Sequence, residues 1–190
     1  NTTGQTSSSG GTGLTTAQMR SAASYTGWDF TSVWYQSGDM RPILRAEAAT
    51  ADSNGVITIS NLHQLALMGA NLSGNYKLAV NLDASATKGL NASDIWSTAG
   101  WVPVGTYVAL NPSKNFTGTF DGQNHTISNL FINRPTEDNV GLFGTTMGAS
   151  ITNIGLIGGS VTGHTAIGGL IGHMTSGTVS NAYNTGDVLF

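Results

Sequence analysis

The chain has 190 residues, of which 39% are hydrophobic and only 9% charged, and it contains 26 glycines and no cysteine. This hydrophobic share argues against disorder, and the missing cysteine excludes disulfides and thiolate metal sites. The net charge of −3 without a basic run disfavours nucleic-acid binding, and no apolar run approaches the ~18 residues of a membrane span, which disfavours membrane insertion.

The first two segments differ in kind. Residues 1–13 are rich in Gly, Ser and Thr, which predicts a flexible linker. Residues 14–46 form a separate unit, with a short helix expected over 15–23 and an aromatic strand after it. We expect this unit, or the helix that follows Ser60, to cover the N-terminal end of the main body, because open strand edges aggregate.

The third segment, residues 47–190, begins with a strand at 56–59 and a helix over 61–70, followed by a strand at 76–82. An irregular insertion occupies 83–115. From Phe116 onward short apolar runs alternate with turn signals, which predicts many short strands.

A short pattern recurs in this last part. Ile127–Leu130, Ile151–Ile154 and Val179–Ala182 share an apolar–hydroxyl–Asn–apolar pattern at spacings of 24 and 28 residues. A glycine-rich pattern, Val140–Gly144 and Ile167–Gly172, recurs after 27. Repeats of this length are typical of stacked coils, so we predict an all-β fold, a parallel β-solenoid, with two short helices in its N-terminal part. A β-sandwich is the alternative.

The repeated asparagines occupy equal places in their units. If the units stack in register, Asn129, Asn153 and Asn181 form a structural ladder in which each amide bonds the next. Three unrelated turn asparagines are the alternative interpretation.

These motifs resemble a known family. The segments 140–144, 167–172 and 177–186 are similar to the GLUG motif of bacterial exoproteins, and 116–130 resembles the segment that precedes it there. The resemblance implies a filamentous-haemagglutinin-like adhesin of the two-partner secretion type, built as a right-handed parallel β-helix. It also implies that 14–46 ends one cassette and 47–190 begins another.

The same resemblance implies a secreted protein of the bacterial cell surface, with host-cell or matrix glycans or proteins as partners and an outer-membrane transporter during secretion. His173-Met174-Thr175 and Asn184 depart from the family pattern, which leaves a shared ligand open. Biofilm and virulence roles belong to the same expectation.

Enzyme chemistry finds little support. A glycosidase needs two carboxyls at a defined separation, and Asp121 is better explained as a turn residue before Gly122. The four histidines lack zinc-ligand spacing and no nucleophile elbow is present. We therefore expect no enzyme activity, no catalytic residue, no metal and no cofactor. A polysaccharide-active enzyme is the least favoured alternative.

Aromatic residues supply the candidate ligand contacts. Trp34, Tyr35 and Trp96 have polar neighbours, so either they fill a core or they stack on a sugar ring. The favoured function is a structural and adhesive segment that extends and presents a polar surface. The alternative is a glycan- or host-protein-binding module that uses the insertions at 28–41 and 83–115.

Overall fold

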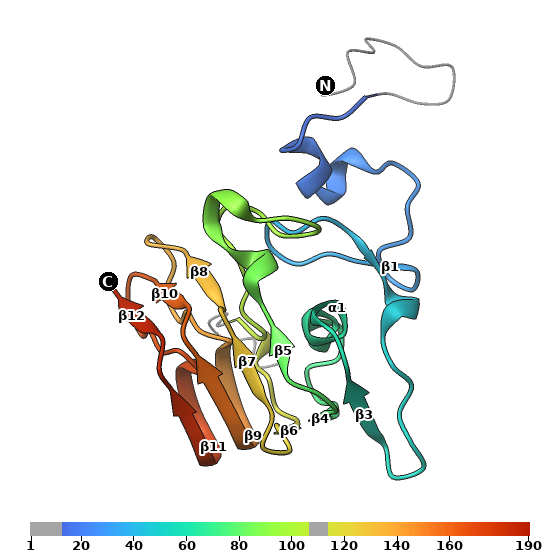
Figure 1. The fold of residues 1–190 in the computed structure, drawn as a ribbon. Coiled ribbons are helices and arrows are strands. Elements are labelled where there is room, and N and C mark those ends of the chain that lie inside the picture. The colour runs from blue at the N-terminus through green and yellow to red at the C-terminus, as the bar shows by residue number, and fades with distance from the viewer. Residues whose placement is uncertain (1–12, 107–113) are drawn as a thin grey trace.

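The computed structural model describes residues 13–106 and 114–190, whose strands form three sheets (Figure 1). The linker expected at 1–13 therefore lies outside the described residues except for Gly13, as does the part of the 83–115 insertion at 107–113. The smallest sheet is an antiparallel pair, β1 (Trp34–Tyr35) and β2 (Ile43–Leu44).

The other two sheets are parallel throughout. A three-stranded sheet has the order β12 (Asp187–Leu189), β10 (Ser160–Thr162), β8 (Phe131–Asn133). The seven-stranded sheet contains β3 (Val56–Ile59), β4 (Asn75–Leu78), β6 (Thr119–Asp121), β9 (Phe143–Ile157), β7 (Thr126–Ser128), β5 (Leu82–Asp83) and β11 (Ile171–Asn184).

Strand β9 organises the seven-stranded sheet. One of its edges pairs with β6 around Ile151 and with β7 around Leu156, and the other pairs with β11 along most of its length. The β9–β11 register places Val179 beside Ile151, and the pairing shifts register around Ser176. Neighbouring repeats thus lie side by side in the same direction.

The expected right-handed parallel β-helix was wrong. The described strands are divided among three separate sheets, one of them antiparallel, and they do not form a closed helical coil. The physical reason is local: most strands have only two to four residues. Short 3-10 turns such as η5 (Ser85–Thr87) and η6 (Gly89–Asn91) also interrupt the ladder before it continues.

The helical segments are short. Where a helix was expected over 15–23, the chain forms two 3-10 turns, η1 (Gln18–Arg20) and η2 (Ala22–Ser24). A further turn is η3 (Arg45–Glu47). The helix expected over 61–70 is present as α1 (Leu62–Ala66), which continues as the 3-10 segment η4 (Leu67–Ala70).

Helix α1 begins where its sequence provides a cap. The Asn61 side chain accepts a hydrogen bond from the backbone N–H of Gln64 at 2.9 Å, and the Gln64 side chain accepts one from the Ser60 N–H at 2.8 Å. The apolar side chains Leu65 and Met68 are then fully buried in the core. The β1–β2 unit packs over η4, since Gly69 leaves room for the Tyr35 ring.

A single hydrophobic core joins the N-terminal unit to the sheets. Its largest members are aromatic: the centroids of Phe116 and Phe143 are 4.9 Å apart, and those of Trp96 and Trp101 are 5.1 Å apart. The chain approaches itself closely at Gly118, where a Cβ atom would lie 1.9 Å from the Gly74 carbonyl oxygen. Only glycine fits at such a contact.

Candidate functional site

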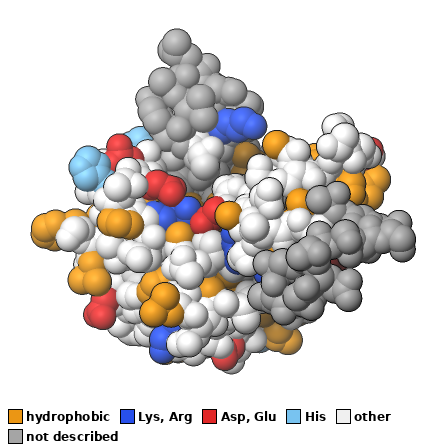
Figure 2. Space-filling model, turned by 90° about the horizontal axis from the view of Figure 1, so that it is seen from above, with side chains coloured by type: hydrophobic (Ala, Val, Ile, Leu, Met, Phe, Trp, Pro, Cys, Tyr) orange, Lys and Arg blue, Asp and Glu red, His pale blue; other side chains and the backbone are white. Residues whose placement is uncertain are grey.

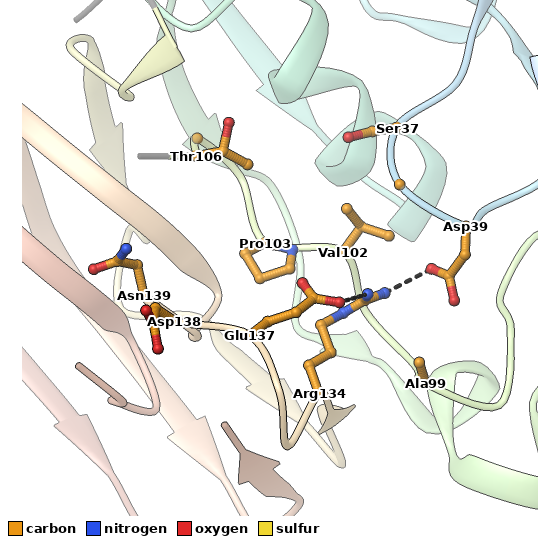
Figure 3. Close-up of a pocket in the computed structure, with 12 residues that line it drawn as sticks. Ser37, Asp39, Ala99, Val102, Pro103, Thr106, Arg134, Glu137, Asp138 and Asn139 are labelled. Atoms are coloured by element: carbon orange, nitrogen blue, oxygen red, sulfur yellow. Dashed lines mark hydrogen bonds and ion pairs between the residues drawn. The ribbon is translucent and has the colours of Figure 1, made fainter. Parts of the chain in front are cut away.

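A cleft of about 690 Å³ is lined by parts of three segments, 37–39, 99–106 and 134–139 (Figure 3). The first two belong to the insertions at 28–41 and 83–115, and the third follows β8. Seen from above, acidic and basic side chains gather near the middle of this face of the molecule (Figure 2). We call this feature the Arg134 cleft.

Arg134 ties the three segments together. Its side chain is only 5% exposed, and its Nη2 donates to Asp39 at 2.7 Å. Nη1 donates to Glu137 at 2.9 Å, and Nε donates to the Trp101 carbonyl oxygen at 3.0 Å. A buried guanidinium is tolerated only when its donors are satisfied, and here each donating nitrogen has a partner in a different part of the chain.

Asp39 is held from two sides, by Arg134 and by the hydroxyl of Ser97. Burial by itself would raise the pKa of Asp39, but the hydrogen bonds from Ser97 and Arg134 outweigh burial and lower it. The Asp39 carboxylate therefore stays ionised at neutral pH. The N-terminal unit is in this way joined to the sheet region by an ion pair as well as by the apolar core.

The cleft carries more negative than positive charge, since it is lined by three carboxylates, those of Asp39, Glu137 and Asp138, and by one guanidinium. Asp138 accepts hydrogen bonds from Thr165 and from His164, the latter at 2.8 Å, and these bonds lower its pKa. Within the described ranges, no group of three or more His, Cys, Asp or Glu side chains is placed to hold a metal ion.

The candidate aromatic contacts separate into two groups. Tyr35 is 9% exposed and Trp96 only 1%, so both side chains lie mainly in the core. Trp34 is half-buried, and its ring stacks on that of Trp28 with centroids 4.1 Å apart. Trp28 itself is 42% exposed, and the Tyr25 ring packs against both Trp28 and Phe30. None of these rings lines the Arg134 cleft.

Two of the three candidate ladder asparagines lie together. Asn181 donates to the Asn153 side-chain oxygen at 3.1 Å, and Asn153 donates to Asp121 at 2.9 Å. Asn129 lies elsewhere and donates to Asp83 at 3.0 Å. The polar column is therefore Asp121–Asn153–Asn181. In the sheet Ile151 pairs with Phe120, which places Asp121 near Asn153, whereas Ile127 pairs with Leu156.

Asp121 has a structural role in this column. Besides the Asn153 amide, its carboxylate accepts a hydrogen bond from the backbone N–H of Gln123, within a tight turn. Burial would raise the pKa of Asp121, but these hydrogen bonds lower it. Glu47, His63 and Asp94 form another polar group, in which the two His63 ring nitrogens lie 2.5 Å and 2.6 Å from the carboxylates.

The sequence did not reveal the Arg134 or His63 groups. The partners of Arg134 are separated from it by up to 95 residues along the chain, and those of His63 by up to 31. The only local signal was the pair Arg134 and Glu137, three residues apart in an otherwise charge-poor chain. In a chain with so few charged residues, a buried arginine indicates that acidic side chains lie near enough to pair with it.

The described chain also has an exposed edge. Strand β11 and strand β12 each pair on one side, and along them Val179, Tyr183 and Leu189 are 42%, 53% and 49% exposed. Apolar side chains on an open strand edge favour association with another strand.

Comparisons with known proteins give one similarity. The chain is 37% identical over 139 residues to Halomucin of Haloquadratum walsbyi, and the match covers 72% of this chain. It covers 1% of the length of Halomucin, so this chain corresponds to a small part of a far longer relative. No family model and no solved structure matches the chain. No helix in the described ranges has the length and apolar character to cross a lipid bilayer.

Proposed function

We propose that the chain is a structural segment of a secreted or surface-associated protein. The observation that carries the proposal is the similarity to a stretch of Halomucin, a very long relative with a mucin-type name. The composition agrees with this proposal, because only 9% of the residues are charged and Ser, Thr, Asn and Gly take their place.

The finer part of the proposal is an adhesive role on a cell surface, as the resemblance to GLUG-motif adhesins implies. Parallel strands from neighbouring repeats place hydroxyl and amide side chains in rows, such as Thr178 against Ser150 at 3.3 Å and Asn181 against Asn153 at 3.1 Å. Rows of this kind offer many weak polar contacts to a glycan or protein surface. The segment would act through its surface and without catalysis.

The experiment first locates the protein on or inside the cell and then measures how well the cells attach to a surface. An antibody raised against this chain should label intact cells of the source organism, and brief protease treatment of those cells should remove the label. Deletion of the segment should then reduce attachment of the cells to a coated surface, without loss of the rest of the protein. Label that appears only after the cells are broken open would contradict a surface location.

A further inference from the structure

The Arg134 contacts attach the N-terminal unit, but that attachment does not require the open cleft beside them. The volume of the cleft, about 690 Å³, falls within the range of roughly 300–1,000 Å³ that is typical of small-molecule sites. It lies where the irregular insertions at 28–41 and 83–115 meet beside β8, and ligand-binding residues are disproportionately found on such connecting segments.

The lining combines a small apolar floor with hydrogen-bonding groups on both sides. Figure 3 shows Val102 and Pro103 in the middle, with Asp39 on one side and Asp138 and Asn139 on the other. The carboxylate side chains are open to solvent, with exposed fractions of 39% for Asp39 and 53% for Asp138. Solvent-accessible carboxylates accept hydrogen bonds from neighbouring hydroxyl groups, and amides both accept and donate them.

Arg134 orients Asp39 and Glu137, and its own side chain is only 5% exposed. Its Nε, Nη1 and Nη2 already donate to Trp101, Glu137 and Asp39. The guanidinium therefore holds Asp39 and Glu137 in place, which lowers the cost of ordering them when a ligand binds. Among the described residues of the lining, three carboxylates outnumber one guanidinium, so the cleft disfavours an acidic ligand.

We propose that the Arg134 cleft binds a neutral saccharide. Sugar hydroxyls would donate to the carboxylates of Asp39, Glu137 and Asp138, and a C–H face of the ring would lie on Val102 and Pro103. The proposal deepens the surface role above and rests on it, because a saccharide site is useful where the chain meets other surfaces. A lysine side chain also suits the negative charge, but it is slender and would leave most of the volume unfilled.

The test is isothermal titration of the full chain with neutral disaccharides built from glucose, galactose, mannose or N-acetylglucosamine. Thr106 is an exposed residue of the lining, so Thr106→Trp fills the cleft without removing a core side chain. The matched control is Thr50→Trp, because Thr50 is exposed and lies outside the lining. We expect at least one disaccharide to bind the parent chain, with an affinity loss of about tenfold or more in Thr106→Trp and less than about twofold in Thr50→Trp.

Glu137→Gln gives a second measurement that keeps the shape of the side chain, and it should weaken binding of the same disaccharide. The proposal is overturned if no neutral disaccharide binds, or if Thr106→Trp binds as the parent does. It is also overturned if glucuronate-containing sugars or a lysine-rich peptide bind the cleft in their place. Surface labelling of cells is scored separately, so loss of saccharide binding and loss of the surface location remain distinct outcomes.

Discussion

Replacement of Arg134 by methionine tests how the N-terminal unit is attached. The substitution keeps the buried stem but removes three polar contacts, to Asp39, Glu137 and the Trp101 carbonyl. The side chains of Asp39 and Glu137 are 39% and 54% exposed, so water replaces the lost partner and each pair contributes only about 0–1 kcal/mol. The Trp101 carbonyl loses a buried donor, which costs about 1–3 kcal/mol.

We therefore expect Arg134→Met to lower the free energy of unfolding by about 1–5 kcal/mol, measured by urea denaturation. The control is Lys88→Met, because Lys88 is exposed, and it should change stability by less than about 0.5 kcal/mol. A double-mutant cycle with Asp39→Asn should give a coupling energy of about 1 kcal/mol.

Hydrogen exchange should show where the destabilisation acts. In Arg134→Met the amides of the β1–β2 pair should lose protection before those of β9, since Asp39 lies between the two short strands. If Arg134→Met matches the stability of Lys88→Met, or if the cycle is additive, the attachment described here is refuted.

Three further predictions concern other contacts. Burial would lower the pKa of His63, but hydrogen bonds to Glu47 and Asp94 raise it. The contribution of His63 to the free energy of unfolding is therefore complete below about pH 6.5 and is lost as the pH rises through the pKa of the folded state. The urea midpoint of the parent should fall relative to that of His63→Gln over that range. Asn153 has a φ of 54°, so Asn153→Ala should be less stable than Asn153→Gly by about 1 kcal/mol in thermal unfolding, and equal stabilities would argue against backbone strain there. Gly118→Ala should lower the free energy of unfolding by about 2–4 kcal/mol, because the new Cβ meets the Gly74 carbonyl. Gly55 has a φ of 77° and open space around it, so Gly55→Ala should lower it by only about 1 kcal/mol. The reverse order in calorimetry would contradict the close approach at Gly118.

Local signals in the sequence predicted local structure well. Asn61, followed by leucines at helical spacing, predicted α1, and the repeated pattern at 151–154 and 179–182 corresponds to the paired strands β9 and β11. In both cases the deciding interactions lie within a few residues or between copies of one motif.

Similarity of motif was misleading where two segments share residue types but not a position in the sheet. Ile127–Leu130 resembles Ile151–Ile154, yet Ile127 pairs with Leu156, and Asp121 takes the place beside Asn153. The register is set by which side chains the core can bury, and Phe120, fully buried opposite Ile151, decides it. The local pattern does not contain this information.

The candidate site was even less accessible to sequence reasoning. Trp96 has polar neighbours along the chain, but tertiary packing against Trp101 buries it. The Arg134 cleft joins residues separated by 95 positions, so its parts gain meaning only after the two insertions fold together. The sequence did predict irregular insertions at 28–41 and 83–115, and parts of both line the cleft.

Neighbouring repeats lie parallel with Thr178 beside Ser150, and a cysteine pair tests this arrangement most directly. The chain has no cysteine of its own, and the two hydroxyl oxygens are 3.3 Å apart. Mild oxidation of the Ser150→Cys/Thr178→Cys variant should give an internal disulfide, because partners on adjacent strands lie within disulfide reach. The Ser150→Cys/Ser180→Cys variant, displaced by one step along the same face, should oxidise far more slowly. Equal oxidation of both variants, or faster oxidation of the displaced pair, would contradict the parallel register.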